Sequence, residues 1–176
     1  MRTMENSSID LPRPRKEVEA LNPYSAPLEG RRNLLRLDFN ENTIGPSPKV
    51  IQTLKGISRE EISIYPEYSG LKEEFKSNLN KKNTNINIPE SEIGIFNGVD
   101  AAINAIFHAY GDFNEVMLST IPTFGYYEPC AHMRGMKIKS IPYEGIDFQY
   151  PFSKICEFIT HHNPKILLIC NPNNPT

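Results

Sequence analysis

The stretch KILLICNPNNPT, residues 165–176, runs from apolar residues into a turn that is rich in asparagine and proline. Two earlier stretches, EIGIFNG at 92–98 and EVMLSTI at 115–121, also run into turns that precede a helix-like pattern. Short apolar runs bounded by turn residues are typical of strands buried in a parallel sheet. The region 92–171 therefore predicts strands that alternate with helices, as in βαβ units.

Four strands and three helices are expected in this region. The strands are 92–98, 115–121, 137–143 and 165–171, and the helices are 99–110, 124–135 and 151–162. Upstream, LLRLDFN at 34–40 alternates apolar and polar residues, which predicts a half-buried strand. A helix capped by Ser47 and an amphipathic helix over 71–79 complete the expected elements. The fold class is thus α/β, with a mostly parallel sheet and helices on both faces.

Composition excludes several kinds of protein. The 176 residues are 39% hydrophobic and 23% charged, which is typical of a folded globular chain. A formal charge of -2 provides no general attraction to nucleic acid or to an anionic membrane. Three cysteines without CxxC spacing predict neither a disulfide framework nor a metal site. We find no membrane-spanning run and no signal peptide, so a cytoplasmic location is expected.

The first 33 residues are rich in charge, proline and serine. Such a composition predicts a partly irregular N-terminal arm. Its basic residues Arg13, Arg15 and Lys16 are expected to be solvated.

A candidate binding site follows from the strand ends, because ligands of open parallel sheets bind outside the carboxyl ends of the strands. FNGVD at 96–100 places Gly98 between an expected strand and the first turn of a helix. The free N–H groups of a helix N-terminus can hold a phosphate without a basic side chain. The alternative is that Gly98 is a simple turn and Asp100 an ordinary first-turn carboxylate.

Two other strand ends offer an aromatic ring and an amide. Phe124 follows one strand, where it can stack on a flat ligand, and Asn174 follows another, where it can donate to a phenolate or carbonyl oxygen. Alternatively, Phe124 and Tyr126 are packing residues and the Asn-Pro pairs form an ordinary turn. A phosphate cradle, a ring and an amide donor together suit an aromatic cofactor with one phosphate, and pyridoxal phosphate meets all three requirements.

Five motifs then carry a resemblance to a known family. They are LDFNENTIGPSPKV, IYPEYSGLKEEF, FNGVDAAI, IPTFGYY and LLICNPNNPT, with a looser match in NPYSAP near Tyr24. In this order the sequence resembles the fold-type I pyridoxal-phosphate aminotransferases, and within them most the histidinol-phosphate aminotransferase branch. The resemblance covers residues 34–176. It implies the aspartate aminotransferase-like fold of pyridoxal-phosphate-dependent transferases.

The resemblance also implies roles for individual residues. The backbone around Val99 and Asp100 is expected to bind the cofactor phosphate. Phe124 matches the aromatic residue that stacks on the pyridine ring, usually a tyrosine in this branch, and Asn174 matches the amide that hydrogen-bonds the phenolic oxygen. Tyr65 matches a tyrosine that reaches the cofactor of the neighbouring subunit, so a homodimer is implied.

On the substrate side, the resemblance assigns Asn40 and Asn42 to the entry segment. The chain departs from the branch at Ile44, where relatives carry a tyrosine that helps to bind a substrate phosphate. It also reads GVDAA where GSDEA is common, which removes a hydroxyl and a carboxylate near the cofactor. A backbone cradle does not depend on either group.

The resemblance places the catalytic groups beyond Thr176. These are the lysine that forms a Schiff base with the cofactor, the acidic partner of the pyridine nitrogen and the arginine that binds the substrate carboxylate. Lys137 and Lys165 are expected at strand starts, away from the cofactor edge. No catalytic residue is therefore expected within the chain, which we interpret as an N-terminal portion that is inactive by itself. Its expected divisions are an arm at 1–33, part of the small domain at 34–64 and the first part of the large domain at 65–176.

Three functions remain open from the sequence. The first is transamination of an amino acid or an amino-alcohol phosphate, with a keto acid as acceptor. The second is decarboxylation of an amino acid on the same fold. The third is a non-catalytic fragment with a binding or regulatory role. A nucleotide-binding domain is disfavoured because GxGxxG and GxxxxGK[ST] are both absent.

Overall fold

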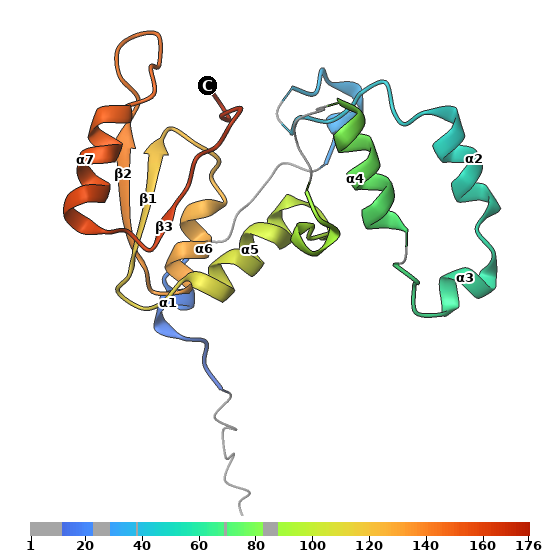
Figure 1. Ribbon diagram of the computed structural model, residues 1–176, viewed down its shortest axis with the longest axis horizontal. Coiled ribbons are helices and arrows are strands. Elements are labelled where there is room, and N and C mark those ends of the chain that lie inside the picture. Colours follow the sequence, from blue (N-terminus) through green and yellow to red (C-terminus); the bar gives the residue numbers. More distant parts are fainter. Residues whose placement is uncertain (1–11, 23–28, 38, 69, 83–87) are drawn as a thin grey trace, which may run out of the picture. The chain divides into compact units, whose positions relative to one another are not determined.

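The computed structural model describes residues 12–22, 29–37, 39–68, 70–82 and 88–176 (Figure 1). The chain divides into two compact units. The first unit combines the segment that ends at Asn22 with residues 96–176, and the second runs from Pro23 to Ile95. This division differs from the expected boundary between residues 64 and 65, which lies inside the second unit. The assignment of segments to the small and large domains of the family stays a prediction.

The first unit contains a three-stranded parallel sheet. Its strands are β1 (Val116–Ile121), β2 (Lys137–Pro142) and β3 (Ile166–Leu167), in the order β2-β1-β3. The register pairs Met117 with Ile138 on one side and with Ile166 on the other. The parallel arrangement confirms the expected fold class. The strand expected over 165–171 is confirmed only for the two residues of β3.

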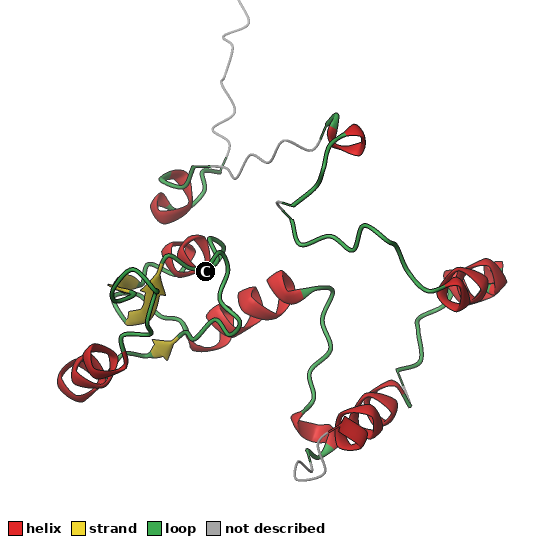
Figure 2. Cartoon of the chain, turned by 90° about the horizontal axis from the view of Figure 1, so that it is seen from above, coloured by secondary structure: helices red, strands yellow, loops and turns green. Residues whose placement is uncertain are grey.

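Helices cover both faces of this sheet (Figures 1 and 2). They are α5 (Val99–Tyr110), α6 (Tyr127–Met133) and α7 (Phe152–His162). Met117, fully buried, packs with residues of α5 and α6, whereas the adjacent Leu118, also fully buried, packs with Ile141 and Ile155. Successive side chains of a strand point to opposite faces, so α7 covers the face opposite to α5 and α6.

The N-terminal arm contributes one turn of helix, α1 (Lys16–Glu19), which contacts α6. The guanidinium of Arg15 donates to the carbonyl of Met133 in the last turn of α6. Arg15 is exposed, as expected, but it is not simply solvated. Residues 23–28, which include Tyr24 and all of NPYSAP except Asn22, lie outside the described residues.

The second unit contains short helices. They are the 3-10 turns η1 (Arg31–Asn33) and η2 (Glu90–Glu92) and the helices α2 (Pro48–Gly56), α3 (Arg59–Ser63) and α4 (Leu71–Lys82). The hydroxyl of Ser47 accepts from the N–H of Lys49 at 3.2 Å, which confirms the expected cap of α2. Helix α3 was not predicted, and it begins with a capping box between Ser58 and Glu61.

Two predicted strands are wrong. Residues 34–37, 39 and 40 form no strand, and Leu34, Leu35 and Leu37 are 68%, 83% and 79% exposed. Residues 92–98 pass from η2 through irregular backbone to α5. A strand needs a neighbour for its backbone hydrogen bonds. The described residues provide such neighbours only in the sheet β2-β1-β3, so neither stretch can pair.

Candidate active site

A glycine-dependent turn opens α5 at the expected phosphate cradle. Gly98 is the N-cap residue, with φ +84° and ψ 167°, a conformation that essentially only glycine adopts. A Cβ at Gly98 would meet no atom within 4 Å, so the turn borders open space. Among the described residues, no side chain forms a capping hydrogen bond at the start of α5. The N–H groups of its first turn are therefore available to an anion.

The charge of Asp100 acts on two groups of the neighbouring helix. Burial raises the pKa of Tyr126 and of Cys130 above their ordinary values, and the negative charge of Asp100 adds to both increases. The carboxylate therefore lies near the start of α6. Val99 is 65% exposed. The sequence assigns the cofactor phosphate to the backbone around Val99 and Asp100, and that assignment stays a prediction.

The loop after β1 carries Phe124. Its ring is half-buried against the core that α5 and α6 form, and it meets Tyr127 edge-on, with ring centroids 5.6 Å apart and planes at 85°. A second contact, at 6.4 Å, joins it to Tyr126. The two tyrosines fix the ring's orientation, which suits a stacking platform.

The loop after β3 carries three asparagines with different environments. Asn171 and Asn174 are exposed, whereas Asn173 is half-buried. The side-chain oxygen of Asn173 accepts from the hydroxyl of Thr123 at 2.8 Å, and its nitrogen donates to the carbonyl of Pro122 at 3.0 Å. Within the described residues, Asn174 has no hydrogen-bond partner, so its amide is available to a ligand.

The first unit thus brings together three of the predicted groups. Phe124 and Asn174 lie on loops that leave the carboxyl ends of β1 and β3, and the hydrogen bonds of Asn173 join these loops. The cradle at Gly98 belongs to the same unit, where α5 packs against α6. The helix that Gly98 opens and the ring of Phe124 share one hydrophobic core.

The other predicted residues belong to the second unit. Tyr65 is 97% exposed. Asn40 is exposed and has φ +53°. The side chain of Asn42 forms a local turn, in which it accepts from the N–H of Ile44 at 3.2 Å and donates to the carbonyl of Gly45 at 3.0 Å. Their assignment to a neighbouring cofactor and to the substrate side stays a prediction.

Sequence reasoning missed the pair Thr123 and Asn173, and it missed the influence on Tyr127 of Cys170 in the loop after β3. Burial, with the Cys170 thiol as the next cause, raises the pKa of Tyr127 to about 12. Neither pairing can be predicted from the sequence. Thr123 and Asn173 are fifty residues apart, and Tyr127 and Cys170 lie on segments that a crossover connection separates. Only the two neighbouring asparagines, at 173 and 174, indicated that the side chains of this loop have a role beyond forming a turn.

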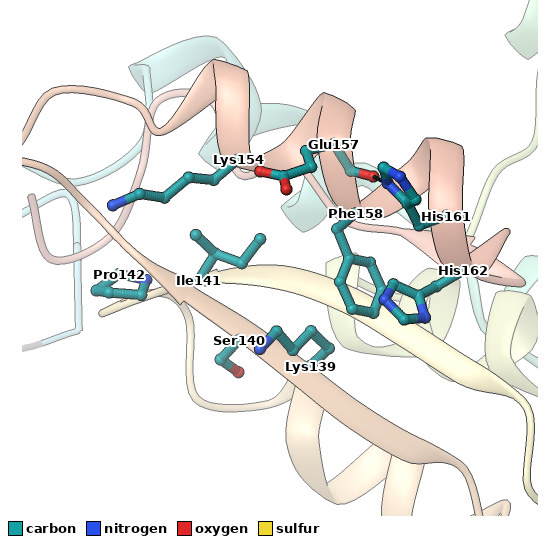
Figure 3. A pocket seen from close by; sticks show the side chains of 9 residues that line it. All are labelled: Lys139, Ser140, Ile141, Pro142, Lys154, Glu157, Phe158, His161 and His162. Atoms are coloured by element: carbon teal, nitrogen blue, oxygen red, sulfur yellow. Dashed lines mark hydrogen bonds between the residues drawn. The ribbon is translucent and has the colours of Figure 1, made fainter.

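The lysines of the first unit lie at strand starts, in α1 or in the groove between β2 and α7. Lys137 begins β2, and the N–H of Lys165 donates to the carbonyl of Val116 at the start of β1, which confirms that both lie at strand starts. Lys139 and Lys154 line a groove of about 360 Å³ between β2 and α7 (Figure 3). Phe124 packs against the core on the other face of the sheet. Lys154 is also paired with Glu144 at 2.9 Å.

The site fits pyridoxal phosphate in the chemistry of its groups. An uncapped helix N-terminus suits the phosphate, a fixed aromatic ring suits the pyridine face, and a free amide suits the phenolic oxygen. Across the described ranges, no group of three or more His, Cys, Asp or Glu side chains is arranged to hold a metal ion. A search of the same ranges finds no helix with the length and apolar character of a membrane span.

Comparisons with known proteins show the family of the chain. The family described as aminotransferase class I and II matches residues 32–176. The histidinol-phosphate aminotransferase of Clostridium novyi is 32% identical over 164 residues, which are 92% of this chain and 44% of that protein. The dihydroxyacetone phosphate transaminase of Campylobacter jejuni is also 32% identical, over 168 residues, with the same shares covered. The chain therefore spans about 44% of the length of these curated relatives.

Solved structures confirm the expected fold. Histidinol-phosphate aminotransferase from Sinorhizobium meliloti, in complex with pyridoxal-5'-phosphate, superposes with a TM-score of 0.74 at 16% identity, covering 97% of this chain and 45% of that one. BacF from Bacillus subtilis, in its apo form, has a TM-score of 0.72 at 18% identity, with 94% and 44% covered. The first of these structures holds the cofactor that the sequence predicts. Because the family match extends over most of its residues, the chain belongs to the aminotransferase class I and II family.

Proposed function

We propose that this chain provides the phosphate, ring and amide contacts of a pyridoxal-phosphate site in an aminotransferase. The observation that carries the proposal is the convergence of two loops at the carboxyl edge of the sheet, joined through Asn173, one with Phe124 and the other with Asn174. Family membership supports it independently.

Each group of the site has a distinct task. The N–H groups of the first turn of α5 hold the cofactor phosphate, where the partial positive charge of the helix end favours an anion. Phe124 stacks on the pyridine ring and Asn174 donates to its phenolic oxygen. When bound, pyridoxal phosphate supplies an electron sink that stabilises negative charge on the carbon of the amino substrate.

The proposed substrate is an amino acid or an amino-alcohol phosphate, with a keto acid as amino acceptor. Support comes from relatives that are named for histidinol phosphate and dihydroxyacetone phosphate. Ile44 is 96% exposed and offers no hydrogen-bond donor to a substrate phosphate. A phosphorylated substrate would therefore require other contacts.

The full assembly is proposed to be a homodimer in the cytoplasm, in which Tyr65 reaches the phosphate of the partner's cofactor. Its phenol is almost fully exposed and thus accessible to a second subunit. Residues 1–176 alone are proposed not to catalyse turnover, because the described lysines of the first unit lie at strand starts, in α1 or on the α7 face.

Equilibrium dialysis of residues 1–176 against pyridoxal phosphate tests the binding site. We expect saturable binding that becomes about three- to tenfold weaker in Phe124→Ala and about tenfold weaker in Asn174→Ala. Lys139→Ala, in the groove between β2 and α7, is the control and should bind normally. Wild-type protein that does not bind the cofactor would refute the proposal.

Turnover is measured separately. Keto acid released from an amino donor by residues 1–176 would contradict the proposed inactivity. Carbon dioxide released without a keto-acid acceptor would favour a decarboxylase. Cofactor binding without either product agrees with the proposal.

A further inference from the structure

We propose that Asn173 is a positioning residue which, with Thr123, locks the loop of Phe124 to the loop of Asn174. The effect on cofactor binding rests on the function proposed above, whereas the lock itself does not. No part of the assigned site explains why Asn173 is half-buried while the neighbouring Asn174 is exposed. Its hydrogen bonds supply that explanation.

The side chain of Asn173 uses its whole amide. The oxygen accepts from the Thr123 hydroxyl at 2.8 Å, and the nitrogen donates to the Pro122 carbonyl at 3.0 Å and to the Thr176 hydroxyl. A primary amide has two donor hydrogens and one carbonyl acceptor. The three bonds therefore satisfy both donor hydrogens and engage the oxygen.

The orientation of this amide follows from its partners. A carbonyl can only accept a hydrogen bond, so the nitrogen of Asn173 must face Pro122. The oxygen is then directed to Thr123, whose hydroxyl can donate. Because two bonds reach residues 122 and 123 from position 173, they cross fifty residues of sequence and fix one loop against the other.

The two locking residues are neighbours in sequence of the two proposed ligand-binding residues. Thr123 immediately precedes Phe124, and Asn173 immediately precedes Asn174. A shift between the loops would therefore change the separation of the stacking ring and the amide donor. A flat cofactor contacts both the ring of Phe124 and the amide of Asn174, so its affinity depends on the distance between them. The affinity of a ligand that occupies only the cradle at Gly98 should not depend on this distance.

Hydrogen–deuterium exchange measures the lock without any ligand. We expect Asn173→Ala and Thr123→Val to increase exchange at the amides of Tyr127 and Cys130, which donate to the carbonyls of Phe124 and Tyr126 after β1. Thr123→Ser retains the hydroxyl and should restore wild-type exchange. Asn171→Ala makes the same kind of change at an exposed position of the same loop and is the matched control. Unchanged exchange at Tyr127 and Cys130 in Asn173→Ala would overturn the proposal.

Ligand binding then tests positioning. In equilibrium dialysis, we expect Asn173→Ala to bind pyridoxal phosphate about fivefold to tenfold more weakly and Asn173→Asp to bind it more weakly still, because a carboxylate oxygen would face the Pro122 carbonyl. The circular dichroism of the bound cofactor should change in both variants. Inhibition of binding by inorganic phosphate should stay the same, since the cradle is outside the lock. Wild-type affinity and circular dichroism in both variants would overturn the positioning role.

The two proposals fail in different ways. If wild-type protein binds no pyridoxal phosphate, the proposed function is wrong, and the exchange experiment still decides whether the loops are locked. If wild-type protein binds the cofactor and the Asn173 variants bind equally well, the proposed function stands and the positioning role is wrong. A global loss of stability is recognised by increased exchange throughout β1, which Thr123→Ser should not show.

Discussion

The replacement Gly98→Ala tests the geometry of the phosphate cradle. The backbone of Gly98 has φ +84° and ψ 167°, which an L-residue adopts only at a cost of about 1–3 kcal/mol. A Cβ at this position meets no atom within 4 Å, so steric contact with the rest of the chain adds nothing to that cost. Alanine also lowers the conformational entropy of the unfolded chain, which offsets about 0.4–1 kcal/mol of this cost. We expect a net loss of about 1–2 kcal/mol in the free energy of unfolding.

Urea unfolding followed by far-ultraviolet circular dichroism measures this loss. Gly125→Ala is the control, because a Cβ at Gly125 also meets nothing within 4 Å and its φ lies outside the left-handed region. The control should be neutral or slightly stabilising. The comparison separates backbone strain from the general effect of replacing a glycine within the first unit.

Phosphate binding gives a second result for the same variant. If the first turn of α5 rotates to relieve the strain, its N–H groups lose their common direction, and the affinity for inorganic phosphate should fall about tenfold. A Gly98→Ala protein with the stability of Gly125→Ala and unchanged phosphate affinity would refute the reasoning. The turn would then be no more than a chain reversal.

Three further predictions concern stability. Leu118→Ala should lower the free energy of unfolding by about 3–5 kcal/mol, because Leu118 is fully buried. Leu34→Ala, at a position that is 68% exposed, should change it little. Similar losses for the two variants in urea unfolding would contradict the assigned core. Gly135→Ala should destabilise by more than about 1 kcal/mol, since φ is +67° and a Cβ would lie 2.4 Å from the Phe113 ring; an unchanged melting temperature would count against this packing. The pKa of Tyr127 is about 12, above the usual value near 10, so the unfolded chain loses this proton first and stability should fall as pH rises from about 10 to 12. Tyr127→Phe should reduce that slope in thermal melts, and an identical slope would exclude Tyr127 as its source.

Local signals in the sequence predicted the helices well. Helix α5 has the predicted bounds 99–110, and α2 begins behind the predicted Ser47 cap. Helical hydrogen bonds join residues four apart, so apolar spacing and capping residues contain most of the necessary information. The short α3 escaped prediction because five residues offer too little periodicity, although its capping box between Ser58 and Glu61 was a readable signal.

Strands depend on partners that a local pattern does not identify. The runs 115–121 and 137–143 pair with each other and form β1 and β2. The equally apolar run 92–98 forms no strand, and the alternating run 34–40 forms none in its described residues. The two outcomes differ because, among the described residues, only the first pair of runs has neighbouring strands. An apolar pattern predicts that one face of a strand is buried, but it does not show whether the backbone N–H and C=O groups find hydrogen-bond partners.

The candidate site shows the same division between local and non-local information. Phe124 and Asn174 were identified as candidates because each follows a strand, and parallel topology brings such positions to one edge. Gly98 was identified because it precedes an expected helix, although the strand expected before it does not form. The roles of all three toward a cofactor stay predictions. Asn173 was not predictable, since its role depends on the Pro122 carbonyl and the Thr123 hydroxyl, which only the folded loops bring within 3.0 Å. Candidate ligand-binding groups can be located from strand ends, whereas the groups that hold them in place are found only from the distances between loops. If the hydrogen bonds of Asn173 set the separation of Phe124 and Asn174, the specificity of this site for a flat, phosphorylated ring depends on a residue that contacts neither the ring nor the phosphate.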